Sequence, residues 1–270
     1  MSLDSMEVPF ISDNFFAELQ MATLVEGSHP LKYRQMCNEI VEIFKSQEDY
    51  NQLIEWFADI GRNLKPQTLL DADGFMVQPD TPSTILPERL RDDGTGFTRG
   101  SLLIYDGRFV YPVKDTQGNV MGWCGYDKFE SPKYLDSMTY GYKAKESTLY
   151  GMEKLRDYYT SSEPVFVTEG IVCTLWLRQC GFQAMASLGS HLTPYVVEIL
   201  KRFGSRLIMI PDSDEAGLKY KKQCKYALPK ARVMQSRVAK DIDDSRQENK
   251  ELEGELRRCF NRFYASPLFR

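Results

Sequence analysis

The sequence contains no apolar run long enough to span a bilayer, and its first ten residues, MSLDSMEVPF, lack the basic and apolar regions of a signal peptide. We therefore expect a cytoplasmic protein with no membrane partner. Soft metal ligands are also scarce, because the chain has two histidines and six cysteines, with no CxxC pair. A structural zinc site needs four such ligands at close spacing, so we expect no zinc in this chain. The cysteines are expected to be small buried residues without disulfides.

The overall charge gives little sign of a nucleic-acid-binding protein. The net charge is −4, which argues against a surface that is basic throughout. A strongly basic stretch over residues 201–240 nevertheless allows a local basic face. With 42% hydrophobic and 27% charged residues, the composition predicts a packed globular protein.

The N-terminal half of the chain divides into two regions. Residues 1–98 predict a helical region and a linker, because helical apolar spacing is followed by a stretch rich in Pro, Asp and Gly from about residue 65. Residues 99–157 predict a mixed, β-rich subdomain. Its short β-rich runs are separated by turns at 106–107 and 117–119, which indicates an antiparallel meander.

The C-terminal half alternates strands with helices. Over residues 158–245 this alternation is typical of a parallel sheet with right-handed crossovers. Gly181 marks the end of one helix, and Thr193 followed by Pro194 marks the start of the next. Residues 246–270 predict a C-terminal helix.

Carboxylates follow three of the strands predicted in this alternating region. In a parallel sheet these strand ends meet at one edge, where ligands bind. Several carboxylates without Cys or His suit a hard cation, Mg²⁺ or Mn²⁺, and point to phosphoryl chemistry. The acids are Glu169 in FVTEG, Asp212 and Asp214 in IPDSD, and Asp241, Asp243 and Asp244 in KDIDD.

Each acidic motif also has a simpler explanation. Asp214 could cap the helix that begins at Glu215, and KDIDD could be the acidic first turn of a helix. The coincidence of all three motifs at strand ends favours a metal site. Gly170 allows a sharp turn beside the acid and a helix N-terminus that favours anions, and Gly189 has a similar place after the second strand.

Glu-Gly after one strand and Asp-x-Asp after another resemble the signature of the Toprim domain. That domain is shared by bacterial-type primases, type IA and II topoisomerases, OLD-type nucleases and RecR-type proteins. The stretches GRFVYPVKDTQGNVMGWCGYDKFESPKYLDS, KESTLYG and ASLGSHLT narrow the choice, because they resemble bacterial DnaG-type primases. The resemblance covers residues 99–245. It implies an α/β fold, in which a Toprim domain with a parallel sheet flanked by helices follows a mixed α+β primase subdomain.

The resemblance also implies roles for individual residues. Glu169, Asp212, Asp214, Asp241 and Asp243 would hold the metal, with Glu169, Asp212 and Asp241 catalytic. Template or nucleotide phosphate would meet Lys133 and Lys145, with Arg108, Lys143, Gly170 and Gly189 contributing to the binding site. The sequence departs from the family pattern at two positions, where Cys173 replaces a further acid and Tyr126 replaces a frequent Arg.

The expected function is that of a DNA primase catalytic core, either of phage or mobile-element type or a fragment of a longer protein, that synthesises short RNA primers on single-stranded DNA with Mg²⁺ or Mn²⁺. Its partners would be the template and ribonucleoside triphosphates. No zinc-ribbon or helicase-binding region is evident, so we expect a separate zinc-ribbon domain or a replicative helicase as a partner. The alternatives are a Toprim-family nuclease and a non-catalytic Toprim nucleic-acid-binding protein.

Overall fold

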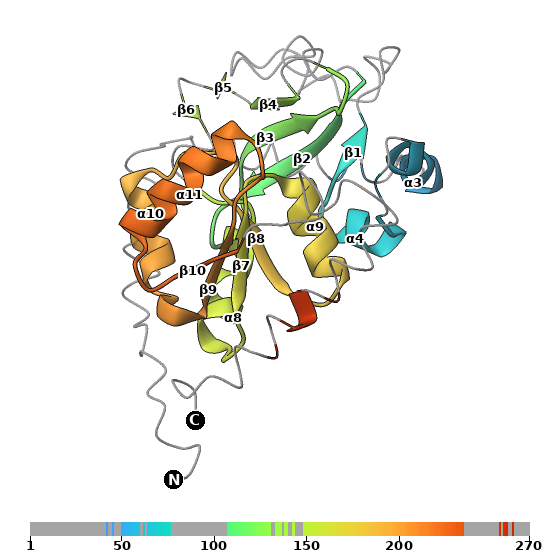
Figure 1. Cartoon of the computed structure of the whole chain (residues 1–270). Coiled ribbons are helices and arrows are strands. Elements are labelled where there is room, and N and C mark those ends of the chain that lie inside the picture. Colours follow the sequence, from blue (N-terminus) through green and yellow to red (C-terminus); the bar gives the residue numbers. More distant parts are fainter. Residues whose placement is uncertain are drawn as a thin grey trace.

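The structure of the chain is a computed structural model (Figure 1). It describes residues 42, 45, 50–59, 62, 64–76, 107–130, 133–136, 138–139, 142–143, 148–234, 254, 256–258 and 261. Over these residues, no helix has the length and apolar character that a membrane span requires.

The predicted alternation of strands and helices forms a four-stranded parallel sheet. Its strands are β7 (Val165–Thr168), β8 (Gln183–Ala186), β9 (Leu207–Ile210) and β10 (Arg232–Val233). The spatial order is β10-β9-β7-β8, and every pair is parallel. The parallel sheet predicted from the sequence is confirmed.

Every residue of β7 and β9 is buried, and successive side chains of a strand point to opposite faces. The sheet therefore packs against apolar cores on both faces. Phe166 and Ile208 pack with α9 (Ile171–Gln179) in one core. The intervening Val167 and Met209 pack in a second core with α8 (Leu155–Thr160), α10 (Pro194–Lys201) and α11 (Glu215–Ala227). Figure 1 shows α10 and α11 on one side of the sheet and α9 on the other.

The helix boundaries follow the sequence signals. Thr193 caps α10 by accepting a hydrogen bond from the Val196 backbone N–H, and Pro194 is its first residue. Gly181 follows α9 with a φ of 87°, a left-handed conformation that glycine adopts readily. These two predictions are confirmed.

The second sheet is the predicted antiparallel meander. Its order is β1-β2-β3-β4, formed by β1 (Phe75–Met76), β2 (Phe109–Lys114), β3 (Val120–Tyr126) and β4 (Tyr134–Asp136). Gly107 and Gly118 have positive φ at the two predicted turns. In the β2–β3 turn, the buried Asp115 carboxylate accepts hydrogen bonds from the backbone N–H groups of residues 117 and 119. A short ribbon follows, β5 (Met138–Thr139) with β6 (Tyr142–Lys143).

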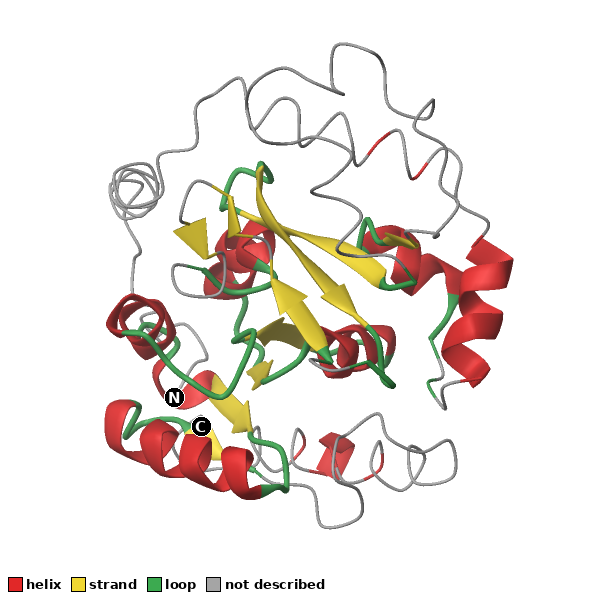
Figure 2. Cartoon of the chain, turned by 90° about the horizontal axis from the view of Figure 1, so that it is seen from above, coloured by secondary structure: helices red, strands yellow, loops and turns green. Residues whose placement is uncertain are grey.

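Helix α9 lies between the two sheets and joins their cores. Its residues 171–177 are all buried, as expected for a helix that is covered on every side. The same core includes Phe57 of α3 (Tyr50–Asp59), Leu69 of α4 (Pro66–Asp71), Tyr111 of β2 and Tyr126 of β3. Seen from above, the strands lie at the centre with helices around them (Figure 2).

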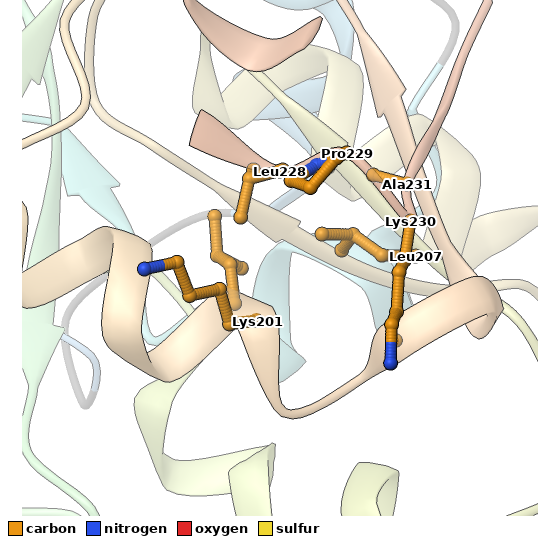
Figure 3. Close-up of a pocket in the computed structure, with 8 residues that line it drawn as sticks. Lys201, Leu207, Leu228, Pro229, Lys230 and Ala231 are labelled. Carbon is orange, nitrogen blue, oxygen red and sulfur yellow. The ribbon is translucent and has the colours of Figure 1, made fainter. Parts of the chain in front are cut away.

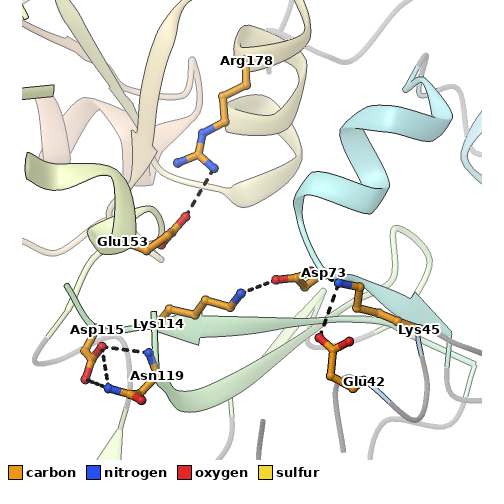
Figure 4. A network of polar contacts seen from close by, with 8 residues as sticks. All are labelled: Glu42, Lys45, Asp73, Lys114, Asp115, Asn119, Glu153 and Arg178. Atoms are coloured by element: carbon orange, nitrogen blue, oxygen red, sulfur yellow. Dashed lines mark hydrogen bonds and ion pairs between the residues drawn. The ribbon is translucent and has the colours of Figure 1, made fainter. Parts of the chain in front are cut away.

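The structure differs from the sequence prediction over residues 66–76, which form α4 and β1 although a loop was expected from about residue 65. Pro66 occupies the first turn of α4, where its missing N–H has no intrahelical role, and Leu69 is fully buried. Asp73 then has a φ of 53° and forms ion pairs with both Lys45 and Lys114, which ties the N-terminal region to β2 (Figure 4).

Candidate active site

The candidate active site lies at the point in the parallel sheet where the strand order reverses. From β7, the chain passes through α9 to β8 on one side, and β9 later pairs with β7 on the other side. Helices α9 and α10 therefore cover opposite faces, and in sheets of this kind the ligand crevice is found beyond the carboxyl ends of the strands at such a point, here those of β7 and β9. Glu169 follows the last residue of β7, and Asp212 lies two residues after β9. The fold thus brings together two of the acids that the sequence singled out.

Glu169 and Asp212 are joined directly. The Asp212 backbone N–H donates a hydrogen bond to Glu169 Oε1 over 3.0 Å. Only 8% of Glu169 is exposed, whereas Asp212 is half-buried. This bond fixes the Glu169 carboxylate beside the Asp212 backbone, at the ends of β7 and β9.

The loop after β8 forms hydrogen bonds with the backbone of Glu169 and of the residue before it. The backbone N–H groups of Ser187 and Gly189 donate to the carbonyls of Thr168 and Glu169, at 2.9 and 3.0 Å. Gly189 has a φ of 142°. The Ser187 hydroxyl accepts a 2.8 Å hydrogen bond from the Tyr220 hydroxyl of α11. Gly189 therefore positions the backbone of Glu169. The sequence analysis predicted only that Gly189 lies after the second strand in a place similar to that of Gly170.

The negative charge of Glu169 affects the pKa of two buried residues of α11, Tyr220 and Cys224. Burial first, and then the Glu169 charge, raises the pKa of the Cys224 thiol to about 12. Burial is also the main cause that raises the pKa of Tyr220 well above its usual value, with Cys224 and Glu169 adding to the shift. Tyr220 therefore stays protonated and remains a hydrogen-bond donor to Ser187.

Asp214 caps α11, as the simpler explanation of Asp-x-Asp predicts. Its Oδ1 accepts a 2.9 Å hydrogen bond from the Gly217 backbone N–H. A Cβ at residue 217 would collide with the backbone of Asp212, so only glycine lets the first turn of α11 pass so close to that residue. The sequence analysis missed Gly217, although a glycine in the first turn of a helix was a visible signal.

Glycine is also required at position 170, because the side chain of Tyr134 approaches it closely. A Cβ there would lie 2.5 Å from the hydroxyl oxygen of Tyr134, the first residue of β4. The antiparallel sheet therefore touches the parallel sheet directly beside Glu169. Tyr134 was not singled out by the sequence analysis, because nothing in a single sequence indicates this contact.

Lys133 and Arg108 lie on the antiparallel side of this contact. Lys133 Nζ is 5.6 Å from the ring centroids of both Tyr126 and Tyr134. The carbonyl of Lys133 accepts hydrogen bonds from the Asp127 backbone N–H at 3.0 Å and from Arg108 Nη1 at 3.3 Å. Arg108 is 6% exposed, so its structural role in holding this turn is clear.

Comparison with known proteins identifies the fold. Residues 166–246 match the family described as Toprim-like. The DNA primase of Deinococcus radiodurans is 34% identical over 122 residues, which cover 43% of this chain and 21% of that protein. The Enterococcus faecalis DNA primase is 27% identical over 217 residues, covering 75% of this chain and 32% of that protein. The chain thus spans about a fifth to a third of the length of these relatives.

Solved structures of primases are similar in fold to this chain. A DnaG primase catalytic domain bound to single-stranded DNA has a TM-score of 0.60 at 20% identity, over 82% of this chain and 80% of that chain. The Aquifex aeolicus primase, with its zinc-binding and RNA polymerase domains, has a TM-score of 0.67 at 21% identity, over 84% of this chain and 60% of that chain. The chain has the fold of a DnaG-type primase core. The resemblance inferred from the sequence motifs is confirmed.

Several of the expected site residues lie outside the described residues. These are Asp241, Asp243 and Lys145, and for Lys143 the structure describes only the backbone, in β6. Among the side chains that the structure does describe, no three acids, histidines or cysteines form a cluster that could hold a metal. The metal-ligand set therefore stays a prediction.

The two departures from the primase pattern are both buried. Cys173 lies in the first turn of α9, is 6% exposed and packs in the core between the sheets. Tyr126 ends β3, is fully buried and accepts a 3.3 Å hydrogen bond at its hydroxyl from Nε of the buried Arg62.

A pocket of about 260 Å³ lies at the other end of the parallel sheet (Figure 3). Leu207, the first residue of β9, lines it together with Leu228, Lys201 and Lys230. Because the acids follow the last residues of β7 and β9, this pocket does not belong to the candidate active site.

Proposed function

We propose that this chain is the catalytic core of a DNA primase, a nucleotidyltransferase that synthesises short RNA primers on single-stranded DNA. In this reaction a 3′-hydroxyl attacks the α-phosphate of an incoming ribonucleoside triphosphate and pyrophosphate leaves. The hydrogen bond from the Asp212 backbone to Glu169 carries the proposal, because it unites two acids at the switch point of a primase fold. The names of the relatives support it further.

The metal would be Mg²⁺ or Mn²⁺. Mg²⁺ is typically bound by one or two carboxylates and completed by water and substrate phosphates, and the donors at the crevice are carboxylates. Glu169 and Asp212 fit this requirement, and Asp214 lies two residues after Asp212 at the start of α11. Asp241 and Asp243 would complete the site. When bound, the ion lowers the pKa of the attacking hydroxyl and neutralises charge on the leaving group.

The remaining residues would hold the nucleic acid and the nucleotide. Lys133 directly precedes Tyr134, whose hydroxyl touches Gly170, and we therefore assign it to phosphates that approach Glu169. Lys143 and Lys145 follow in the same segment of the sequence, and Arg108 holds the Lys133 carbonyl. We further propose that a separate zinc-ribbon domain or a replicative helicase assists the chain.

One assay separates the possible activities. The protein is incubated with a single-stranded DNA template, labelled ribonucleotides and Mg²⁺ or Mn²⁺, and the products are resolved on a denaturing gel. We expect short RNA that disappears when EDTA is added. Cleaved template would instead indicate a nuclease, and the absence of both products from a folded protein that binds DNA would indicate a binding protein.

A further inference from the structure

The Lys133 side chain is held by two aromatic rings. Tyr126 and Tyr134 lie directly opposite each other on β3 and β4, so their side chains share one face of the sheet. Their ring centroids are 5.1 Å apart with an interplanar angle of 42°, and Lys133 Nζ is 5.6 Å from each centroid. Both distances are within the range of a cation–π attraction.

The backbone on either side of this arrangement is fixed as well. The Lys133 carbonyl accepts hydrogen bonds from Asp127 and Arg108, and Asp127 follows Tyr126 directly. The Tyr126 hydroxyl accepts a hydrogen bond from Arg62, which anchors the buried ring. The ammonium group is therefore confined by its own backbone and by two anchored rings.

The second ring connects this arrangement to the acids. The Tyr134 hydroxyl lies against Gly170, and Gly170 follows Glu169. Moving Tyr134 toward the parallel sheet is prevented by the Gly170 backbone, and moving it away would open the contact between the sheets. The position of the Lys133 ammonium is thus set relative to the acidic crevice.

We propose that Tyr126 and Tyr134 form an aromatic seat that positions Lys133 to bind phosphate beside the acidic crevice. This proposal rests on the proposed function and deepens it. Tyr126 provides an aromatic ring in this arrangement, and Lys133 provides the positive charge. Tyr126 and Tyr134 are positioning residues, and Lys133 is the residue that contacts the phosphate of a nucleotide or of the template strand.

The seat is tested by a double-mutant cycle between residues 126 and 133. Binding of a fluorescent single-stranded oligodeoxynucleotide is measured by anisotropy across a salt series, and binding of ATP with Mg²⁺ is measured by calorimetry. The variants are Tyr126→Leu, Lys133→Ala and their combination, with Tyr126→Phe as the variant that keeps the ring. Lys225→Ala, an exposed residue of α11, is the matched lysine control.

We expect Tyr126→Leu to weaken binding about threefold to tenfold, because the lysine loses one of its two rings. Lys133→Ala should weaken binding at least as much and, for the oligonucleotide, reduce the salt slope by about one unit. Adding Tyr126→Leu to Lys133→Ala should cause no further loss. Tyr126→Phe should retain most of the affinity, and Lys225→Ala should change little.

The two ligands distinguish the source of the phosphate. A loss confined to ATP assigns Lys133 to the nucleotide, and a loss confined to the oligonucleotide assigns it to the template. Equal losses from Tyr126→Leu in both backgrounds, or no effect of Lys133→Ala on either ligand, would overturn the seat. Thermal unfolding of each variant verifies that the protein is folded.

The outcome is separable from that of the proposed function. If the unmodified chain makes RNA primers but residues 126 and 133 show no coupling, the seat is wrong and the primase function stands. If the coupling is present but the unmodified chain makes no RNA, the seat stands as a phosphate-binding device and the polymerase function is wrong.

Discussion

The two sheets contribute differently to the candidate active site. The parallel sheet supplies Glu169 and Asp212 from strand ends, and the hydrogen bond from the Asp212 backbone to the Glu169 carboxylate leaves little freedom. The antiparallel sheet supplies a cation, Lys133, through a long flexible side chain held by aromatic rings. In the proposed site, the acids that would bind a metal are fixed by backbone geometry, whereas the lysine that would bind a polyanion is confined only by weak contacts. Changes on the parallel side should therefore have the larger effects.

The largest effect is expected from Asp212→Asn. This variant keeps the backbone N–H that holds Glu169 but removes a negative charge from the crevice. Primer synthesis should fall at least about a hundredfold, a typical loss when a preorganised electrostatic group is removed. The melting temperature should be unchanged or higher, because repulsion between the acids is relieved.

The control for this variant is Asp157→Asn, at an exposed position of α8, which should leave synthesis unchanged. Full activity of Asp212→Asn would show that the acidic crevice is not the metal site.

Gly217→Ala should be the most destabilising small change. A helical Gly→Ala substitution normally stabilises by about 1 kcal/mol, but here the new methyl group collides with the Asp212 backbone. We expect a net loss of about 1–3 kcal/mol in the free energy of unfolding, measured by urea denaturation. Gly254→Ala is the matched control, because its new Cβ would be 3.6 Å from the end of the Arg258 side chain and should be tolerated. Equal stabilisation of both variants would contradict the close approach of α11 to Asp212.

Much of the parallel side could be predicted from the sequence, and little of the antiparallel side could. Apolar runs that end in Glu169 and Asp212 indicate strands and their polar edge, and the caps at Thr193 and Asp214 are local signals. The strand order, which puts β7 between β8 and β9, depends on long-range packing that periodicity does not encode. The seat depends on the pairing of Tyr126 with Tyr134 and on the approach of Tyr134 to Gly170, which are also long-range contacts.

The contact between the two sheets is tested by Gly170→Ala, alone and together with Tyr134→Phe. The added Cβ would lie 2.5 Å from the Tyr134 hydroxyl, so the single variant should lose about 1–2 kcal/mol of stability. Removing that hydroxyl in the double variant should restore part of the loss, as measured by thermal unfolding. Absence of any rescue would mean that the sheets do not meet at this point.

Tyr220→Phe should have the smallest effect. The variant removes the buried hydroxyl that donates a hydrogen bond to Ser187 in the loop after β8. The loss of this hydrogen bond should cost about 1 kcal/mol of stability. Synthesis should fall only slightly, because Ser187 still contacts the carbonyls of Thr168 and Gly189. Tyr226→Phe, at a side chain that is 91% exposed, is the control and should change neither property. A large loss of synthesis with unchanged stability would give Tyr220 a role beyond support.

The division between an acidic side and a basic side is tested most directly by Mn²⁺ binding, measured by electron paramagnetic resonance on the unmodified chain, Asp212→Asn and Lys133→Ala. The account predicts that Asp212→Asn weakens Mn²⁺ binding at least about tenfold, because a carboxylate ligand is lost. Lys133→Ala should leave Mn²⁺ affinity unchanged or slightly higher, because it removes a positive charge. Wild-type Mn²⁺ affinity in Asp212→Asn would contradict the account, since the acids that end the parallel strands would then not hold the metal.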